Sequence, residues 1–420
     1  MNSIAWIILA ALLLAFLLNL IADVLNLKAM KNCPPDEFKS YYNAKRYRRS
    51  QHYLRENTHL GWISSGFNLF AILIFWFGGG FPGLDAIVRG PGWGTVATGV
   101  VYIATLVLIQ GLVSLPFQIY ATFVVEARYG FNRTSPATFV LDRLKGMVLG
   151  LALGGPLLAG IIGLFEVAGD NAWWYAWLMV IVFMLGMQYV APTWIMPLFN
   201  RFERLRDESL RNAILGYAAS IQFPLKNVFV MDGSRRSSKS NAFFTGFGRN
   251  KRIVLFDTLV KDHSTAELVA VIGHEMGHYK KHHLLTGLFI NIFQTGLMFF
   301  LLSLCVSEPA LFEAFGMPHV SVYAGMVFFG LLYAPVESFL GLVGMMVSRR
   351  NEFSADRFAV DTTQNAEALI SALKTLSVSH LSNLTPHPFY VFLNYSHPPV
   401  MARIRAIRAH GGETVRAAGR

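Results

Sequence analysis

The sequence is poor in charged side chains for its length. Only 15% of its 420 residues are Asp, Glu, Lys or Arg, whereas soluble domains carry about 25%. Hydrophobic residues make up 54% of the chain, and the mean hydropathy is +0.43. This composition argues against an ordinary soluble globular protein and indicates an integral membrane protein.

Cysteine and acidic residues are also scarce. Two cysteines, Cys33 and Cys305, permit at most one disulfide bridge, which excludes a disulfide-rich scaffold. Lys and Arg outnumber Asp and Glu by 36 to 25, a net charge of +11. A basic excess can indicate nucleic-acid binding, but in an apolar protein it also arises from the positive-inside rule. The positions of the basic residues distinguish these two explanations.

Seven apolar runs are long enough to cross a bilayer, which takes roughly 20 helical residues. They lie at residues 4–25, 60–81, 96–117, 147–167, 173–198, 284–306 and 320–347. The runs predict an all-α polytopic membrane protein. In this organisation, residues 1–198 hold transmembrane helices 1–5 and residues 284–347 hold helices 6 and 7. Residues 199–283 and 348–420 form two longer hydrophilic segments.

The basic residues lie on one side of these predicted helices. Of the 36 Lys and Arg residues, 35 fall on that side, and only Arg89 falls on the other. The positive-inside rule therefore predicts an N-terminus outside and a cytoplasmic C-terminus. The partner of the basic surface is then the lipid bilayer and not nucleic acid. Cys33 and Cys305 would lie about 30 Å apart across the hydrocarbon core, so we expect two free thiols.

The cytoplasmic segment 199–283 has the pattern of a small α+β unit. A polar helical stretch at residues 203–220 precedes three short apolar runs at 228–231, 242–244 and 252–256. We expect these runs to form a small antiparallel sheet. The capping box at residues 264–267 then opens a helix that we expect to run directly into the sixth transmembrane helix.

That capped helix carries an HExxH motif at His274, Glu275 and His278. Side chains four residues apart lie on one helix face, so both imidazoles can reach one Zn²⁺. The glutamate is placed to take a proton from zinc-activated water without itself being a ligand. The alternative is a solvated helix end, because residues 280–283 are all Lys or His.

A hydrolytic zinc site usually has three protein ligands. The downstream candidates for the third are Glu337, Glu352, Asp356 and His397. Glu352 and Asp356 are four residues apart on a predicted helix immediately inside the seventh span, on the same membrane face as the HExxH. Glu352 has the alternative of an ion pair with a neighbouring arginine. Glu337 lies about four turns deeper in the membrane.

Several motifs together resemble one known family. The chain has HExxH, then a seventh membrane helix, then Asn-Glu-Phe-Ser-Ala-Asp at 351–356. It also has Ser-Asn-Ala-Phe-Phe-Thr-Gly at 240–246, His397-Pro398 and Arg403. Over most of its length it is similar to the integral-membrane zinc metallopeptidases of the CAAX prenyl protease type 1 family.

The resemblance implies a fold and a set of roles. The fold is a ring of seven transmembrane helices around a large chamber, closed on the cytoplasmic side by a zincin-like protease portion. One Zn²⁺ would bind to the two HExxH histidines and Glu352, with Glu275 as the general base. The remaining implied site residues are His397 at the oxyanion, Asn241 at the substrate backbone, and Asp356 and Arg403 as supports of the zinc ligands.

Without the family resemblance, the sequence leaves the roles of Asn241 and His397 open. Asn241 suits an edge strand that binds substrate or a simple turn, and His397 suits the start of a rigid turn before Pro398. Gln110, Asn291 and Gln294 are polar at membrane depth, where they either bond neighbouring helices or line the chamber.

The predicted function is a zinc endopeptidase of membrane-associated substrates, for which the resemblance implies prenylated C-terminal peptides. Two other functions compete with it. One is an intramembrane protease of the site-2 type, whose Asp-Gly motif follows HExxH; here Asp232-Gly233 precedes it. The other is a non-enzymatic seven-helix transporter or receptor.

The C-terminal sequence carries no lysine-based or KDEL-like signal. We therefore expect a bacterial plasma membrane and not the ER, with a broader role in cleaving membrane-associated or misfolded proteins.

Overall fold

The computed structural model describes residues 1–225, 227–245 and 252–418. Within these residues, seven helices are long and apolar enough to cross a membrane. They are Ser3–Lys28, Ala44–Phe77, Thr95–Glu126, Pro136–Val167, Gly169–Phe199, His283–Cys305 and Val322–Thr363. The predicted all-α polytopic membrane protein is confirmed, and both cysteines are free.

Local sequence explains where the spans begin and bend. Asn2 and Asn43 cap α1 (Ser3–Lys28) and α2 (Ala44–Phe77) by accepting backbone N–H groups. The fourth span joins α5 (Pro136–Leu149) to α6 (Gly155–Val167) through a π-helical turn, and the fifth joins α7 (Ala172–Val190) to α8 (Met196–Phe199) in the same way. Pro156 and Pro192 lie at these turns, where the missing N–H breaks the regular hydrogen-bond ladder.

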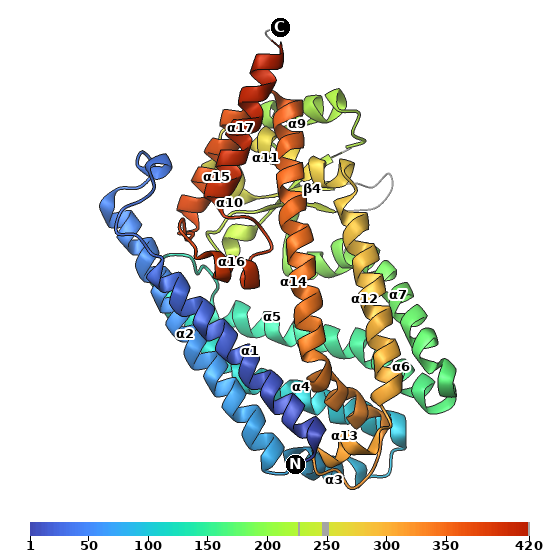
Figure 1. Cartoon of the computed structure of the whole chain (residues 1–420). Coiled ribbons are helices and arrows are strands. Elements are labelled where there is room, and N and C mark those ends of the chain that lie inside the picture. The colour runs from blue at the N-terminus through green and yellow to red at the C-terminus, as the bar shows by residue number, and fades with distance from the viewer. Residues whose placement is uncertain (226, 246–251, 419–420) are drawn as a thin grey trace.

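The two termini lie at opposite ends of the molecule (Figure 1). At the N-terminal end, the short helices α3 (Gly80–Arg89) and α13 (Pro309–Glu313) cover the ends of the spans. Arg89, the lone basic residue predicted outside, pairs there with the buried Asp85 at 3.2 Å. Its guanidinium also donates to the Tyr323 hydroxyl at 2.6 Å, which ties α3 to the first turn of the seventh span.

Polar side chains inside the membrane part connect neighbouring helices. Gln110 in α4 (Thr95–Tyr120) donates to Asn68 in α2 at 2.9 Å. Gln294 donates to the Leu340 carbonyl at 3.4 Å. Gln110 also lines a cavity of about 480 Å³ between α1, α2, α4 and the seventh span. Gln110 therefore bonds a neighbouring helix, as the first predicted alternative has it, and also lines this cavity.

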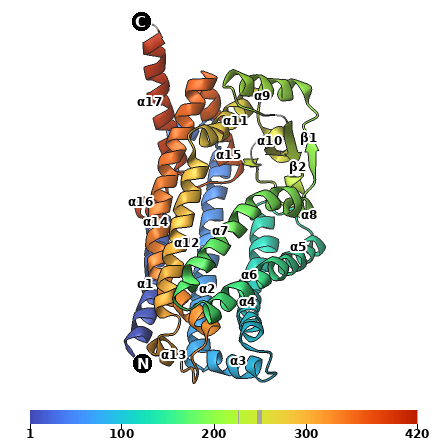
Figure 2. The same cartoon turned by 90° about the vertical axis from the view of Figure 1, so that its right-hand side faces the viewer.

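A small sheet lies at the end of the molecule opposite the N-terminus, beside α9 (Glu208–Ser220) and α10 (Asp257–Asp262) (Figure 2). Its strands are β1 (Phe202–Arg204), β2 (Asn227–Met231), β3 (Ala242–Thr245) and β4 (Arg252–Phe256), in the order β1-β2-β4-β3. The three predicted strands are confirmed in position, and β1 is additional.

The prediction of an antiparallel sheet is wrong for one strand pair. β2 and β4 run parallel, whereas β1 pairs with β2 and β3 pairs with β4 in antiparallel fashion. The connection is long enough for the crossover that parallel neighbours need, whereas a tight turn can join only antiparallel neighbours. The chain between β2 and β4 instead crosses over through β3, which takes the edge position of the sheet.

The HExxH helix is α11 (Thr265–Lys280), and its predicted capping box between Ser264 and Glu267 is present. It does not run directly into the sixth span, contrary to the prediction. His282 has a left-handed backbone (φ 58°), which ends the hydrogen-bond ladder before α12 (His283–Cys305) begins. The break lets α11 lie against the seventh span while α12 follows a direction of its own.

The seventh span is part of a single 42-residue helix, α14 (Val322–Thr363). At 1.5 Å per residue it is about 63 Å long, twice the thickness of a hydrocarbon core. Its last turns therefore extend out of the membrane with Glu352 and Asp356 on them. The chain then continues through α15 (Ala366–Ser379), α16 (Pro388–Asn394) and α17 (Val400–Ala418), which surround this extension.

Candidate metal centre and active site

The closest approach of α11 to α14 is made possible by Gly277 within the HExxH motif. A Cβ atom at this position would lie 3.2 Å from the Cα of Ala355, tighter than an ordinary contact. Because glycine has no side chain, the helix carrying the two histidines can lie directly against the helix carrying Glu352. Sequence spacing and helix packing together therefore produce the site.

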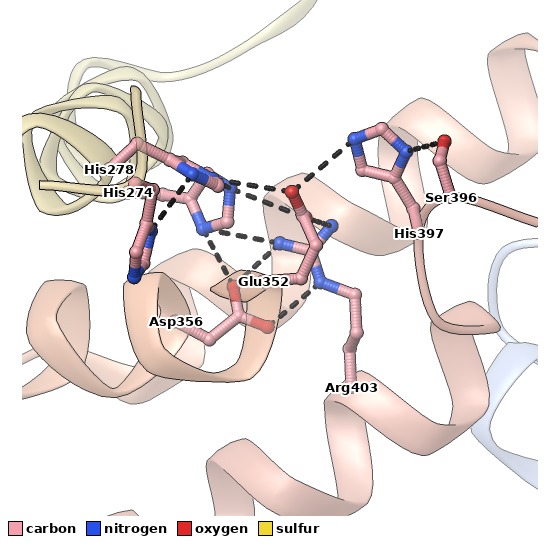
Figure 3. A network of polar contacts seen from close by, with 8 residues as sticks. His274, His278, Glu352, Asp356, Ser396, His397 and Arg403 are labelled. Carbon is pink, nitrogen blue, oxygen red and sulfur yellow. Dashed lines mark hydrogen bonds and ion pairs between the residues drawn. The ribbon is translucent and has the colours of Figure 1, made fainter. Parts of the chain in front are cut away.

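His274, His278 and Glu352 meet at one point (Figure 3). The Nε2 atoms of the two histidines are 3.1 Å apart. Glu352 Oε1 lies 3.2 Å from His278 Nε2, and Glu352 Oε2 lies 3.5 Å from His274 Nε2. Glu352 is only 3% exposed, and its Oε2 atom accepts no hydrogen bond from the described residues. These three side chains could hold a metal ion.

The buried ion pair of Arg403 and Asp356 contacts His274 on the Nδ1 side of its ring. Arg403 on α17 donates from Nε and Nη2 to the two oxygens of Asp356, at 2.8 and 2.5 Å. Asp356 Oδ1 in turn lies 2.9 Å from His274 Nδ1. Because this carboxylate can hold the Nδ1–H, a metal ion that displaces the second ring proton would bind to Nε2 of His274. Arg403 Nη1 also lies 3.3 Å from Glu352 Oε2.

For both His274 and Glu275, burial and the neighbouring charges act on the pKa in opposite directions, and the net result is a raised pKa. Burial lowers the pKa of His274, but the carboxylates of Asp356 and Glu352 outweigh it and raise that pKa to about 9. Burial raises the pKa of Glu275 above its ordinary value, against the opposing effect of the two histidines. A carboxylate with a raised pKa is a better proton acceptor near neutral pH.

His397 approaches the same point from the loop between α16 and α17. Its Nε2 atom lies 3.3 Å from Glu352 Oε1, on the side of the carboxylate away from the HExxH histidines. Its Nδ1 atom is 2.9 Å from the hydroxyl of Ser396. The side chain is 65% exposed, so it faces the open part of the site.

These side chains line a cavity of about 880 Å³ that extends to the edge of the sheet. Asn241 lines its wall directly before β3 and is exposed there. The Asn241 carbonyl accepts the Phe256 N–H at 3.0 Å, so the residue continues the pairing of β3 with β4. The outer edge of β3 is unpaired among the described strands. Gly246, the last residue of the motif at 240–246, lies outside the described residues.

Two of the sequence candidates lie away from this cavity. Glu337 is 15 residues before Glu352 on the same helix, which is about 22 Å along its axis, and it does not line the cavity. Asp232 accepts the backbone N–H of Arg201 at 2.8 Å and is likewise not among the lining residues. The arrangement required by a site-2-type protease is therefore not formed.

Sequence reasoning gave His283 no role at the site and named it only in the alternative of a solvated helix end. Its Nδ1 atom lies 3.2 Å from Nδ1 of His278, so the second HExxH histidine also has a partner for its other ring nitrogen. The turn at His282 places the start of α12 close to α11 and thereby makes this contact. The signal in the sequence was the spacing of His283 five residues after His278.

Comparisons with known proteins agree with this geometry. Residues 23–201 match the family model described as CAAX prenyl protease N-terminal, five membrane helices, and residues 204–410 match that of peptidase family M48. The probable CAAX prenyl protease 1 of Schizosaccharomyces pombe is 36% identical over 90% of this chain and 82% of its own length. The chain belongs to the CAAX prenyl protease 1 family.

Other members cover the chain just as fully. The CAAX prenyl protease 1 homolog of Caenorhabditis elegans is 32% identical over 91% of this chain and 92% of its own. The crystal structure of S. mikatae Ste24p superposes with a TM-score of 0.92 at 29% identity, covering 97% and 99% of the two chains. As a family member, the chain is a multi-pass membrane metalloprotease of the M48 family and not a transporter or receptor.

His380, at the C-terminal end of α15, was also missed. Its Nε2 atom accepts the Ser240 N–H at 2.9 Å, which requires that nitrogen to be unprotonated. Burial, with smaller effects from Lys239 and His263, lowers the pKa of His380 to about 4. The hydrogen bond therefore belongs to the neutral ring.

This lowered pKa makes stability depend on pH. The unfolded chain takes up a proton at His380 near pH 6.5, before the folded protein does, so the stabilisation is complete above that pH and is lost as the pH falls toward 4. We expect the melting temperature in detergent to fall more between about pH 7 and pH 5 in the wild type than in His380→Gln, whose amide oxygen accepts the same hydrogen bond without titrating. Equal falls in the two proteins would contradict this.

Proposed function

We propose that the protein is a zinc metalloendopeptidase that hydrolyses peptide bonds of membrane-associated substrates. The observation that carries the proposal is the convergence of His274, His278 and Glu352 at one point of a cavity bordered by an unpaired strand edge. The Nε2 atoms of His274 and His278 face the two carboxylate oxygens of Glu352, and a cation lying between them would explain why these three side chains converge.

The spacing of the donor atoms suits zinc. Bonds of about 2.0–2.1 Å in a tetrahedron separate neighbouring ligand atoms by about 3.3–3.4 Å. Here the two histidine Nε2 atoms are 3.1 Å apart, His278 Nε2 is 3.2 Å from Glu352 Oε1, and His274 Nε2 is 3.5 Å from Glu352 Oε2. Two histidines and one glutamate also form a ligand set typical of hydrolytic zinc, in which a fourth position is open for reaction. Zinc bound there would acidify a water molecule and polarise the scissile carbonyl.

The chain's own residues would perform the remaining steps. Glu275 neighbours His274 on α11 and lines the cavity, so it would accept the proton of the attacking water and return it to the leaving amine. His397, on the other side of Glu352, would donate a hydrogen bond to the oxygen that becomes negative. Asp356 and Arg403 would hold His274 in the tautomer that leaves Nε2 free.

Substrate would bind along the edge of the sheet. The outer edge of β3, which pairs with no other described strand, can add an extended peptide strand through backbone hydrogen bonds, and Asn241 at its start would fix the position of that strand. The names of the relatives, CAAX prenyl proteases, favour substrates with a prenylated C-terminal segment. A bacterial plasma membrane as the location, with a broader range of substrates, stays a prediction; the curated relatives compared are eukaryotic.

We further propose that the protease end of the molecule is cytoplasmic and the N-terminus outside. Seven spans put the termini on opposite sides, and the cytoplasmic parts would be residues 199–283 and 348–420. The support is the asymmetry of 35 basic residues against Arg89 alone.

Cysteine labelling tests this orientation. Cys33 is exposed after the first span, and Cys305 lies near the opposite end of α12. In a Cys305→Ser background, a membrane-impermeant maleimide should label Cys33 only after the membrane is permeabilised. Labelling of Cys33 in sealed, right-side-out vesicles would contradict the proposed orientation.

Separate substitutions test the metal and the base. Glu275→Gln should retain one zinc per chain while peptide hydrolysis falls by about 10²–10⁴-fold, because the proton acceptor is lost and the ligands remain. His274→Ala should lose both zinc and hydrolysis. The measurements are elemental analysis of purified protein and cleavage of an internally quenched peptide with a prenylated cysteine fourth from its C-terminus.

Glu203→Gln is the matched control, since Glu203 pairs with Arg206 on the exposed surface. It should change neither zinc content nor activity. Undiminished hydrolysis by Glu275→Gln, or stoichiometric zinc in His274→Ala, would overturn the assignment.

A further inference from the structure

The segment that leads into β3 contacts the membrane part of the molecule through Arg236, which pairs with Asp142 of α5, and through Lys239. Lys239 Nζ lies 3.1 Å from Glu126 Oε2 and 2.9 Å from the Tyr53 hydroxyl. It also lies over the rings of Phe131 and Tyr53, at 4.5 and 5.3 Å from their centroids. Lys239 is two residues before Asn241, so this contact is made immediately beside the proposed substrate-binding strand.

The partners of Lys239 belong to the membrane part of the molecule. Glu126 ends the third span, and Tyr53 lies in α2. The Tyr53 hydroxyl donates to Glu126, which joins the two helices to each other as well as to the lysine. The Lys239 and Glu126 side chains are 35% and 25% exposed, so the pair is partly withdrawn from water and is stronger than a surface ion pair.

The next two residues, Ser240 and Asn241, form hydrogen bonds with other parts of the molecule. The Ser240 N–H donates to His380 of the α15 end, and the Asn241 carbonyl accepts the Phe256 N–H of β4. The Lys239 carbonyl accepts the Thr258 hydroxyl at 3.3 Å. Three consecutive residues are thus bound to the membrane helices, to the C-terminal segment and to the sheet.

The position of β3 matters because a peptide added to its edge takes its register from this strand. A strand that shifts by one residue presents its other face, and each residue advances the chain by about 3.3 Å. A peptide paired with β3 inherits any such displacement. An error of about 1 Å in the position of a reacting group can reduce a rate by about 100-fold.

We infer that Lys239, Glu126 and Tyr53 form a positioning clamp that fixes β3 relative to the metal ligands. The inference rests on the proposed function, and these are positioning residues because they do not touch the metal ligands. The clamp makes the rate of peptide hydrolysis depend on a contact between the membrane helices and the sheet.

A nearby ion pair provides a matched control. Arg128, two residues after Glu126, pairs with Glu56 of α2 at 2.7 Å. This pair joins the same two helices but does not involve Lys239. Its disruption should leave the position of β3 unchanged.

The test compares Lys239→Met, Glu126→Gln, Lys239→Arg and Glu56→Gln in the full-length protein, with the prenylated peptide described above. We expect Lys239→Met and Glu126→Gln each to lower kcat about 10–100-fold at full zinc content. The double variant Lys239→Met/Glu126→Gln should be no worse than either single variant, because both break one unit. Lys239→Arg should recover most of the rate, and Glu56→Gln should match the wild type.

Other outcomes separate the clamp from alternatives. A lower melting temperature with wild-type kcat per zinc-loaded protein would overturn the clamp and leave only a structural contact. Additive losses, or an equal loss in Glu56→Gln, would do the same. If Lys239→Met fails to fold, Glu126→Gln and Lys239→Arg decide the question. Absence of zinc-dependent cleavage by the wild type would instead refute the proposed function.

Discussion

The contact between α11 and α14 is the constraint on which the rest of the site depends. Gly277 allows the two helices to touch, and the contact brings a motif from one helix to a glutamate from another, 74 residues further along the chain. The length of α14 then places this meeting point beyond the membrane. The turn at His282 is needed for the same reason, since a straight continuation of α11 into α12 would fix both helices on one axis.

The charged side chains at the site form a chain of contacts beside the α11–α14 interface. Arg403 neutralises Asp356, Asp356 orients His274, and the two histidines face Glu352. Arg403 Nη1 also lies 3.3 Å from Glu352 Oε2, although this oxygen accepts no hydrogen bond from the described residues. A buried carboxylate without such compensation would be costly. A cation bound at the centre would therefore form one electrostatic arrangement with the ion pair of Arg403 and Asp356.

The sequence was sufficient for those features that follow from local patterns. Apolar run length located seven spans, the capping box located the start of α11, and the HExxH spacing located His274 and His278. Glu352 was one of four candidates by position and was selected by the family resemblance. Features that depend on long-range packing were not predictable. The parallel pairing of β2 with β4 depends on a crossover, and the roles of His283, His380 and Lys239 depend on which helices meet. A lone polar residue in the sequence does not indicate its partner.

The central claim is that His274, His278 and Glu352 bind one zinc ion at the cytoplasmic end of the membrane helices. X-ray absorption spectroscopy at the zinc edge, on protein purified without added metal, tests it most directly. The account predicts one zinc per chain with two imidazole nitrogens and carboxylate or water oxygens at about 2.0–2.2 Å, and a loss of one oxygen ligand in Glu352→Ala if metal is retained. A metal-free protein, or zinc with sulfur ligands from Cys33 or Cys305, would contradict it.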